Sequence, residues 1–574
     1  MKTNTICKHI FVMFCLIQSY SLKAQEVPPV IIHVETAGTL PSLISSTEKD
    51  LITDLTLSGN LNGTDINFIR EMAGRDYKDN VTTGKLTKLN LADATIVAGG
   101  DYYIFLYEFN YLNYTKNNAI SSSMFLNLSN LTSLILPKNI TYIGSNAFKG
   151  CTGLTSLTIP GGVATIDLNA FYDCSGLTSI TIPDGVTSIG GSAFYGCIGL
   201  TSIAIPTTIS SISENTFEKC KGLTSITIPS NVNSIACGAF YDCTELTSVI
   251  LPNTISSIAC SAFYNCKKLA SIEIPNSVTS IEESTFSGCS GLTSILIPDN
   301  VTYIGQGAFS YCTGLTSINI GSGVTTIEDQ TFAGCSALKE FVVAESNTTY
   351  TSFESVLFNK NKDLLFAYPN AKSKVYTIPN SVTSIGESAF YNCKGLTTVI
   401  IPNTVTSIGQ NAFYGCTALL EMHSKALTPP NATPTISPES MKNSCKLVNS
   451  RTLTSTNTAS SIFYGIDKSI CKLYVPQGAT AAYRNTEGWS DFTYIIEEES
   501  TSIIQTKASN IKVYVDKNAI VARGLDLGDE IFIYNELGAL LQSVRVTDDI
   551  TRINVATGHT YLVKTIARTF KLAL

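Results

Sequence analysis

Apolar and polar positions repeat along most of the chain with a period of 23 residues. The clearest marker is a phenylalanine that returns in register ten times, and twice more after one interruption: Phe125, Phe148, Phe171, Phe194, Phe217, Phe240, Phe263, Phe286, Phe309, Phe332, Phe390 and Phe413. Such a period is typical of solenoids, in which short units that cannot bury an apolar face alone are stacked. We therefore expect an elongated stack whose function lies on its surfaces.

Each unit predicts one short strand followed by turns, as the segment Leu177–Cys197 illustrates. Ile180 and Ile182 alternate with polar residues and so point to one side of a strand. Pro183 ends that strand, because proline cannot donate to a sheet ladder. Phe194–Cys197 suits a single helical turn whose inner face carries the ring and the thiol. Units stacked about 4.8 Å apart would form a parallel sheet with its concave side toward solvent.

The repeat L-x-x-I-x-I-P-x-x-V-x-x-I-G-x-x-A-F-x-x-C resembles the bacterial BspA-type, treponemal-class leucine-rich repeat, and residues 131–344 and 376–424 follow it closely. The segments Leu51–Gly59 and Cys471–Gly478 resemble the lead-in and the closing cap of surface proteins of the Bacteroides group. The resemblance implies a leucine-rich-repeat solenoid of short parallel strands and 3-10 or single-turn helices with irregular caps. It also implies cell-surface adhesion, with host matrix proteins or other bacteria as partners in relatives.

The flanks predict further domains. An apolar run at Ile10–Ile17 after Lys2 and Lys8 reads as an export signal that is cut near Ala24. No later apolar run reaches the ~20 residues that a membrane helix needs, so we expect no transmembrane segment. We expect this order: signal peptide 1–24, N-terminal cap and irregular repeats 25–120, solenoid 121–425 with a hairpin insert at about 345–375, C-terminal cap 426–499, and a β-sandwich at 503–574.

The interruption between Phe332 and Phe390 contains two apolar runs, Ser355–Phe358 and Leu364–Pro369, around a polar turn. This pattern predicts a β-hairpin standing off the solenoid. A role in absorbing curvature is favoured over a dedicated binding loop.

After Glu499 the pattern changes to seven short alternating strands, which predict a small β-sandwich. Ile533–Gly538 and Gly558–Lys564 resemble the type A carboxy-terminal sorting domain of Bacteroidetes secretion. Both an active sorting signal and a retained surface module remain open.

The chain has 17 cysteines, and eleven of them occupy one repeat position: Cys151, Cys174, Cys197, Cys220, Cys243, Cys266, Cys289, Cys312, Cys335, Cys393 and Cys416. We expect these to be buried thiols that pack as small apolar groups. Zinc is not expected, because a column of single thiols does not offer four ligands around the ion. Cys237 and Cys260 lie off this column but one period apart, and Cys445 and Cys471 flank the C-terminal cap. For each of these two pairs a disulfide and free buried thiols both remain open.

Candidate chemistry is sparse. Beyond the signal the only histidines are His33, His423 and His559, in separate regions, and no phosphate loop, nucleophile elbow or zinc-protease motif occurs. We expect no enzyme, cofactor or bound metal. Charged residues make up 14% of the chain with a net charge of −7 and no basic stripe, which argues against nucleic acid as a partner.

Two outward columns on the strands remain. A nearly uniform serine column, from Ser133 to Ser317, suggests a structural hydroxyl ladder. The second column varies and is the candidate binding surface: Ile135, Thr158, Thr181, Ala204, Thr227, Ile250, Glu273, Leu296, Asn319 and Val342. Ile250, Leu296 and Val342 would contribute an apolar recognition patch.

The expected function is therefore non-enzymatic binding of other macromolecules by an exported protein, at the outer membrane surface or secreted. Host extracellular-matrix or bacterial surface proteins are the expected partners, and glycans are a weaker possibility. The alternative is an architectural or self-associating surface protein without a specific ligand.

Overall fold

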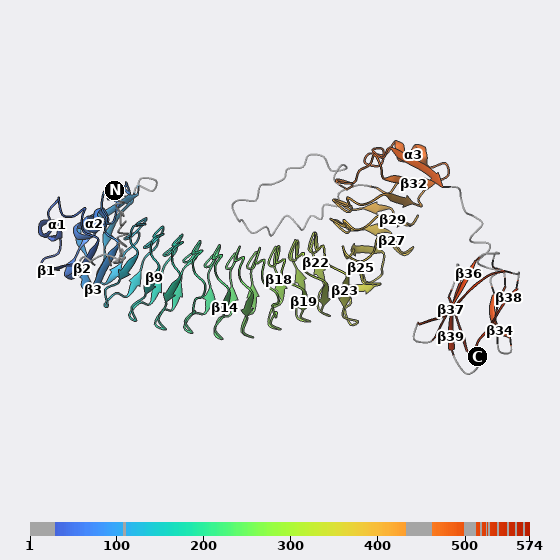
Figure 1. The fold of residues 1–574 in the computed structure, drawn as a ribbon, viewed down its shortest axis with the longest axis horizontal. Helices are drawn as coiled ribbons and strands as arrows, with labels where there is room; N and C mark the ends of the chain where they lie inside the picture. Colours follow the sequence, from blue (N-terminus) through green and yellow to red (C-terminus); the bar gives the residue numbers. More distant parts are fainter. Residues whose placement is uncertain are drawn as a thin grey trace, which may run out of the picture.

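A computed structural model describes residues 29–106, 111–431 and 462–498 and most of residues 512–573. It confirms the leucine-rich-repeat solenoid: short parallel strands are stacked along most of the described chain, with little helix (Figure 1). The signal expected at residues 1–24 and also Cys445 lie outside the described residues.

The N-terminal cap closes the first end of the stack with a parallel sheet and one regular helix. Its elements are β1 (Val30–Val34), α1 (Leu40–Leu43), β2 (Asp54–Leu61), α2 (Gly63–Met72), β3 (Lys88–Ile96), β4 (Gly99–Leu106) and β5 (Tyr111–Thr115). Asn62 and Asp65 form a capping box at the start of α2. The buried guanidinium of Arg70 donates to the carbonyl oxygens of Met124 and Leu126, which joins the cap to the first repeat.

Two series of strands run along the stack. The first series carries the outward columns, and we call its exposed side the strand face: β7 (Ser133–Ile135), β9 (Ser156–Thr158), β11 (Ser179–Thr181), β14 (Ser225–Thr227), β16 (Ser248–Ile250), β19 (Ser294–Ile297), β21 (Ser317–Ile320), β23 (Glu340–Val343), β27 (Val375–Thr377), β29 (Thr398–Ile401), β31 (Glu421–Ser424), β32 (Lys472–Pro476) and β33 (Tyr494–Glu498).

The second series consists of two-residue strands on the other side of each turn: β6 (Ala119–Ile120), β8 (Tyr142–Ile143), β10 (Thr165–Ile166), β12 (Ser188–Ile189), β13 (Ser211–Ile212), β15 (Ser234–Ile235), β17 (Ser257–Ile258), β18 (Ser280–Ile281), β20 (Tyr303–Ile304), β22 (Thr326–Ile327), β28 (Ser384–Ile385) and β30 (Ser407–Ile408). Paired strands of this second series are parallel and 23 residues apart, for example Thr165 opposite Ser188.

The phenylalanine column fills the centre of the stack. The ring centroids of Phe171 and Phe194 lie 5.3 Å apart with planes 2° from parallel, and both side chains are fully buried. Ile180 and Ile182 also point inward, as the alternation predicted. The column thus supplies each unit with a buried ring that packs on its neighbours.

The segment around each phenylalanine differs from the expected single helical turn. It forms consecutive turns, because Ser192 has a φ of 53° and the amide of Phe194 donates to the carbonyl of Thr216 in the next unit, 2.9 Å away. These hydrogen bonds run between units rather than along a helix, so this side of the stack is also held together by a ladder.

The insert also differs from the expected hairpin standing off the solenoid. It forms β24 (Tyr350–Phe353), β25 (Val356–Asn359) and β26 (Leu364–Ala367), which pair antiparallel in that order, and β26 then pairs in parallel with β28. Leu357 packs into the core on its N-terminal side, whereas Val356 and Phe358 pack into the core on its C-terminal side. The insert is therefore a wall between two hydrophobic cores.

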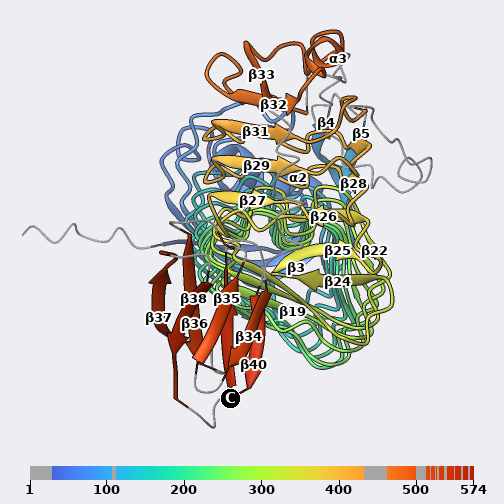
Figure 2. The ribbon, with the colours of Figure 1, turned by 90° about the vertical axis from the view of Figure 1, so that its right-hand side faces the viewer.

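This wall divides the solenoid into a first stack, from β6 to β23, and a second stack, from β27 to β33, and the direction changes between them (Figure 1). β23 and β27 are not paired with each other, whereas the hydroxyl groups of Tyr311 and Tyr391 meet across the bend, 3.1 Å apart. Figures 1 and 2 place the strand face on the outer side of the bend. At the bend the strand face is therefore not concave, because the insert separates β23 from β27.

The column cysteines are buried, as expected, and most also donate a hydrogen bond. The thiol of Cys174 donates to the carbonyl of Phe148, 3.0 Å away, and the same contact recurs along the stack. Burial raises the pKa of Cys151, Cys289 and Cys335 to about 12. Cys471 is a free buried thiol.

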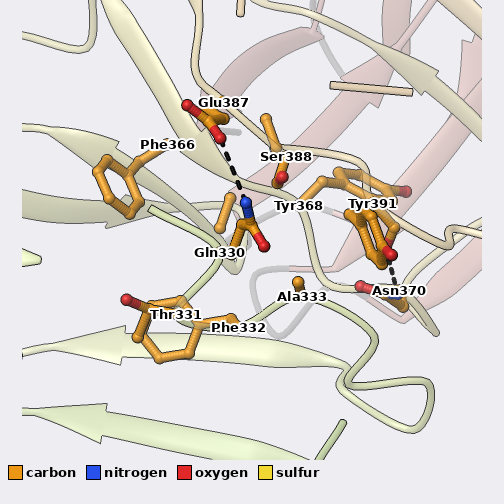
Figure 3. A pocket seen from close by; sticks show the side chains of 12 residues that line it. Gln330, Thr331, Phe332, Ala333, Phe366, Tyr368, Asn370, Glu387, Ser388 and Tyr391 are labelled. Atoms are coloured by element: carbon orange, nitrogen blue, oxygen red, sulfur yellow. Dashed lines mark hydrogen bonds between the residues drawn. The ribbon is translucent and has the colours of Figure 1, made fainter. Parts of the chain in front are cut away.

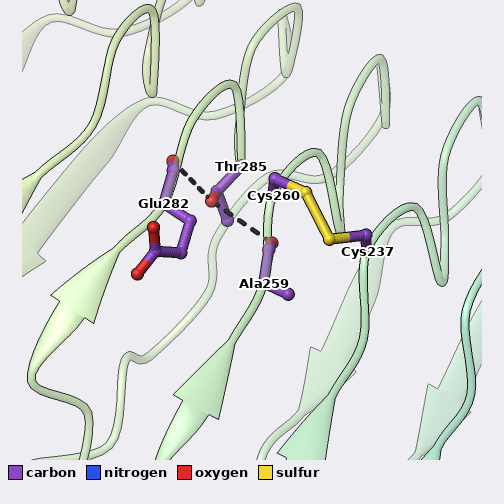
Figure 4. The surroundings of a disulfide bond; sticks show 5 residues. All are labelled: Cys237, Ala259, Cys260, Glu282 and Thr285. Carbon is purple, nitrogen blue, oxygen red and sulfur yellow. Dashed lines mark hydrogen bonds between the residues drawn. A yellow bond between two sulfur atoms is a disulfide. The ribbon is translucent and has the colours of Figure 1, made fainter. Parts of the chain in front are cut away.

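Cys237 and Cys260 lie in neighbouring turns with their Cα atoms 4.8 Å apart, and their sulfur atoms are joined as a disulfide (Figure 4). Both residues stand three places before a column phenylalanine, a position that we call the lateral slot. The bond links two adjacent units at this slot.

The second stack is followed by a C-terminal cap and then by a β-sandwich. Tyr483, in α3 (Thr480–Arg484), and Trp489 close the second core and donate to the carbonyls of Ala426 and Pro430. Beyond them a sandwich has the sheets β34-β35-β38 and β37-β36-β39-β40: β34 (Lys512–Asp516), β35 (Ala519–Arg523), β36 (Glu530–Asn535), β37 (Leu540–Arg545), β38 (Ile550–Asn554), β39 (Thr560–Lys564) and β40 (Thr569–Ala573). The described residues after 511 thus contain seven strands, the number that the sequence predicted.

Candidate binding surface

The variable column lies on the strand face in a single register. Thr227 is opposite Ile250, and Leu296, Asn319 and Val342 follow one another across three paired strands. Asn319 is half-buried, and the other column members are exposed; Ala204 and Glu273 hold the same position in turns that lack a regular strand. The column is thus open to solvent along the first stack.

The apolar members of this column are not adjacent. Ile250, Leu296 and Val342 are 64%, 65% and 44% exposed, but Glu273 separates the first two and Asn319 separates the last two. At about 4.8 Å per strand, successive apolar residues are therefore ~10 Å apart. The structure shows an alternating apolar and polar column rather than a continuous patch.

The expected structural ladder of serine hydroxyls is wrong. The hydroxyls from Ser133 to Ser317 make no hydrogen bond within the described residues, whereas in most units the threonine one place earlier donates to the carbonyl one unit back. Thr178 does so to Thr155 at 3.0 Å, and Thr247 does so to Thr224 at 2.9 Å. The serine hydroxyls are consequently available to solvent or to a ligand.

The strand face continues into the second stack, which the candidate column did not include. There the second column runs Thr377, Ile400, His423, Tyr474 and Ile496, and the first runs Val375, Thr398, Glu421, Lys472 and Tyr494. Val375 and Tyr494 are 55% and 51% exposed. The 23-residue step from Thr377 to Ile400 to His423 was a sequence signal that would have found the first part of this column.

His423 lies on this surface, next to the C-terminal cap. Its ring stacks on that of Tyr474, with centroids 4.5 Å apart, and its Nδ1 lies 2.5 Å from Oε1 of Glu498. Lys425 also donates to Glu498. Burial acts to raise the pKa of Glu498, but these hydrogen bonds outweigh it and hold the pKa below its ordinary value. The network fixes an aromatic platform that the first stack lacks.

His33 also has partners that the sequence did not reveal. Its Nδ1 lies 2.9 Å from the hydroxyl of Ser58, and its Nε2 lies 3.0 Å from a carboxylate oxygen of Glu35. The side chains of His33 and Glu35 are 61% and 89% exposed, so water screens this chain of contacts. An apolar hollow in the cap is lined by Val30 and Ile32, which alternate with His33 and so point to the other face of β1.

Other chemistry is limited across the part of the chain that the structure describes. That part contains no group of three or more His, Cys, Asp or Glu side chains arranged to hold a metal ion. Within the same ranges, no helix has the length and apolar character needed to cross a membrane.

Two solved structures are similar in sequence to this chain. A leucine-rich repeat protein from Bacteroides ovatus is 26% identical, over 59% of this chain and 86% of that chain, with a TM-score of 0.43. A leucine rich cell surface protein from Faecalibacterium prausnitzii is 29% identical, over 60% of this chain and 89% of that chain, with a TM-score of 0.40. No curated protein sequence matches the chain.

A family model described as a BspA type leucine rich repeat region matches residues 118–246, 233–365 and 362–486. These matches cover the wall and both stacks except for β33. They span well over half of the sequence, and they coincide with the stacked units that the structure shows. The chain therefore belongs to the BspA type leucine rich repeat family.

Proposed function

We propose that the protein is a non-enzymatic, exported protein that binds other macromolecules through its strand face. One observation carries this proposal: the inward residues of each unit repeat almost unchanged, whereas the outward second column is exposed and differs from unit to unit. A backbone that repeats from unit to unit with variable exposed side chains suits recognition, since a repeat scaffold leaves specificity to surface residues.

The second stack is the part of this face that we expect to contribute most to affinity. Tyr474, Tyr494 and His423 present aromatic rings there, and Val375 and Ile496 add apolar area. Aromatic residues are enriched where proteins bind one another, since each buries a large area and has few rotatable bonds. Proteins of the host matrix or of bacterial surfaces are the proposed partners.

Location at the cell surface or secretion is part of the same proposal. It is supported by the export-signal pattern before Ala24 and by the similarity to the leucine rich cell surface protein of Faecalibacterium prausnitzii. The C-terminal sandwich, with its likeness to a sorting domain, is the proposed sorting or surface module.

The proposal is tested by capture. The chain from residue 25 onward, immobilised, is exposed to extracted matrix proteins and to bacterial surface proteins, and captured partners are identified and titrated. We expect Tyr474→Ala with Ile496→Glu to weaken the captured partner at least tenfold, and Thr227→Lys with Leu296→Glu to weaken it if the partner spans both stacks.

The matched control is Ile198→Glu, because Ile198 is 49% exposed but lies in a turn outside the outward columns. It should leave capture unchanged. Equal affinity for the control and for both strand-face variants would place the site elsewhere. Capture of nothing except further copies of the chain would instead favour the architectural, self-associating alternative.

A further inference from the structure

Two acidic side chains face each other across the bend, in the lateral slot. Asp329 and Glu387 each stand three places before a column phenylalanine, Phe332 and Phe390, so the insert separates two residues that occupy consecutive places in the same column. Each carboxyl group is close enough to the other to alter its pKa through a side-chain hydrogen bond. The side-chain amide of Gln330 donates to Oε1 of Glu387, 3.3 Å away (Figure 3).

No positive charge balances this pair. Neither carboxylate takes part in an ion pair within the described residues. Burial raises the pKa of both groups, and the neighbouring Asp329 raises that of Glu387 further, to about 7. Two partly buried carboxylates in contact repel each other unless a proton or a cation lies between them.

A separate observation indicates a missing partner at the same place. Ser388 is only 8% exposed, and its hydroxyl has no hydrogen-bond partner. It lines a small cleft at the bend together with Gln330 and Glu387 (Figure 3). A buried hydroxyl without a partner costs about 1–3 kcal/mol, so such a group calls for a ligand.

We propose that this cleft is a binding site for a hard divalent cation, Ca²⁺ in preference to Mg²⁺, which ties the two stacks together. The ligands are the side-chain oxygens of Asp329, Gln330, Glu387 and Ser388.

The chemistry of the donors supports this choice. All four side chains offer oxygen, which Ca²⁺ and Mg²⁺ prefer over nitrogen or sulfur ligands. Gln330 would turn its amide so that the oxygen faces the ion in place of the nitrogen. Ca²⁺ tolerates irregular geometry, whereas Mg²⁺ demands a near-ideal octahedron, and donors on two separate turns favour the more tolerant ion.

The experiment is calorimetric titration of CaCl₂ into the chain from residue 25 onward after removal of metal with a chelator, with MgCl₂ as the comparison. We expect one Ca²⁺ per chain in the millimolar range of weak extracellular sites, about 10⁻⁴–10⁻³ M. Saturating Ca²⁺ should raise the unfolding midpoint by about 2–4 °C. Glu387→Gln and, independently, Asp329→Asn should weaken Ca²⁺ binding at least tenfold.

The matched control is Glu283→Gln. Glu283 occupies the same lateral slot, but its neighbours in that column are Cys260 and Gln306 rather than an acid, and this variant should bind Ca²⁺ as the parent does. The proposal is overturned if the parent binds no Ca²⁺ up to ~10 mM. An unfolding midpoint that then changes between about pH 6 and 8 would show that a shared proton suffices. The proposal is equally overturned if Ca²⁺ binds with the same affinity to both acid variants.

Discussion

The side-chain hydroxyl of Thr178 donates to the backbone carbonyl oxygen of Thr155, 3.0 Å away in the preceding unit, and that oxygen also accepts from the backbone amide of Thr178 at 2.9 Å. Ser179, the next residue, exposes its hydroxyl without such a contact. The two neighbouring hydroxyl columns therefore differ in role although both repeat with the same regularity.

Thr178→Val should lower the free energy of unfolding by about 0.5–1.5 kcal/mol, because it removes one hydrogen bond but keeps the shape of the side chain. Ser179→Ala should change it by no more than about 0.5 kcal/mol. Urea unfolding followed by circular dichroism measures both. A larger loss for Ser179→Ala than for Thr178→Val would restore the serine column as the structural one.

Leu357 and Phe358 are adjacent and fully buried, but they face opposite cores. Replacing either by alanine should cost about 2–5 kcal/mol. Leu357→Ala should speed amide hydrogen exchange mainly in the first stack, and Phe358→Ala mainly in the second. Hydrogen exchange read by mass spectrometry separates the two, and identical patterns would show that the wall does not divide the cores.

Alkaline pH should destabilise the solenoid. The buried thiols have a raised pKa, about 12 at Cys289, so their stabilising effect is complete below the unfolded-state pKa of about 8.5 and is lost as pH rises toward the folded value. Each thiol should contribute a loss of up to about 1.4 kcal/mol per pH unit above pH ~8.5.

The slope of unfolding free energy against pH shows whether the thiols cause the alkaline loss of stability. Cys289→Ala should flatten the dependence of unfolding free energy on pH by one proton, whatever its effect at pH 7. Urea titrations at several pH values between ~7 and ~10 provide the measurement. An unchanged slope in this variant would mean that other groups control the alkaline loss.

The Cys237–Cys260 disulfide should be detectable in the purified chain. Under denaturing conditions, reduction should add two alkylation sites, which Cys237→Ser with Cys260→Ser should abolish. The bond closes a loop with a sequence separation of 23, and the double variant should therefore lose up to about 3 kcal/mol of stability. Equal alkylation before and after reduction would mean that both thiols are free.

Sequence periodicity was sufficient for the scaffold but not for the contacts between columns. The inward positions of Ile180 and Phe194 followed from spacing alone, because a strand or turn in a stack has one inner side. Whether Thr178 or Ser179 bonds its neighbour depends on small differences in direction that the pattern does not contain. Two further features left readable signals. The consecutive apolar residues Val356, Leu357 and Phe358 are typical of a strand buried on both faces, and the lateral slot pairs Asp329 with Glu387 once the insert is removed.

The wall formed by β24, β25 and β26 also bears on how such a protein can change over generations. Since β25 gives alternate side chains to two separate cores, a unit gained or lost by unequal recombination on one side leaves the packing on the other side intact. The first and second stacks can therefore lengthen or shorten independently. The length of the first stack can change without altering the aromatic platform on the second stack.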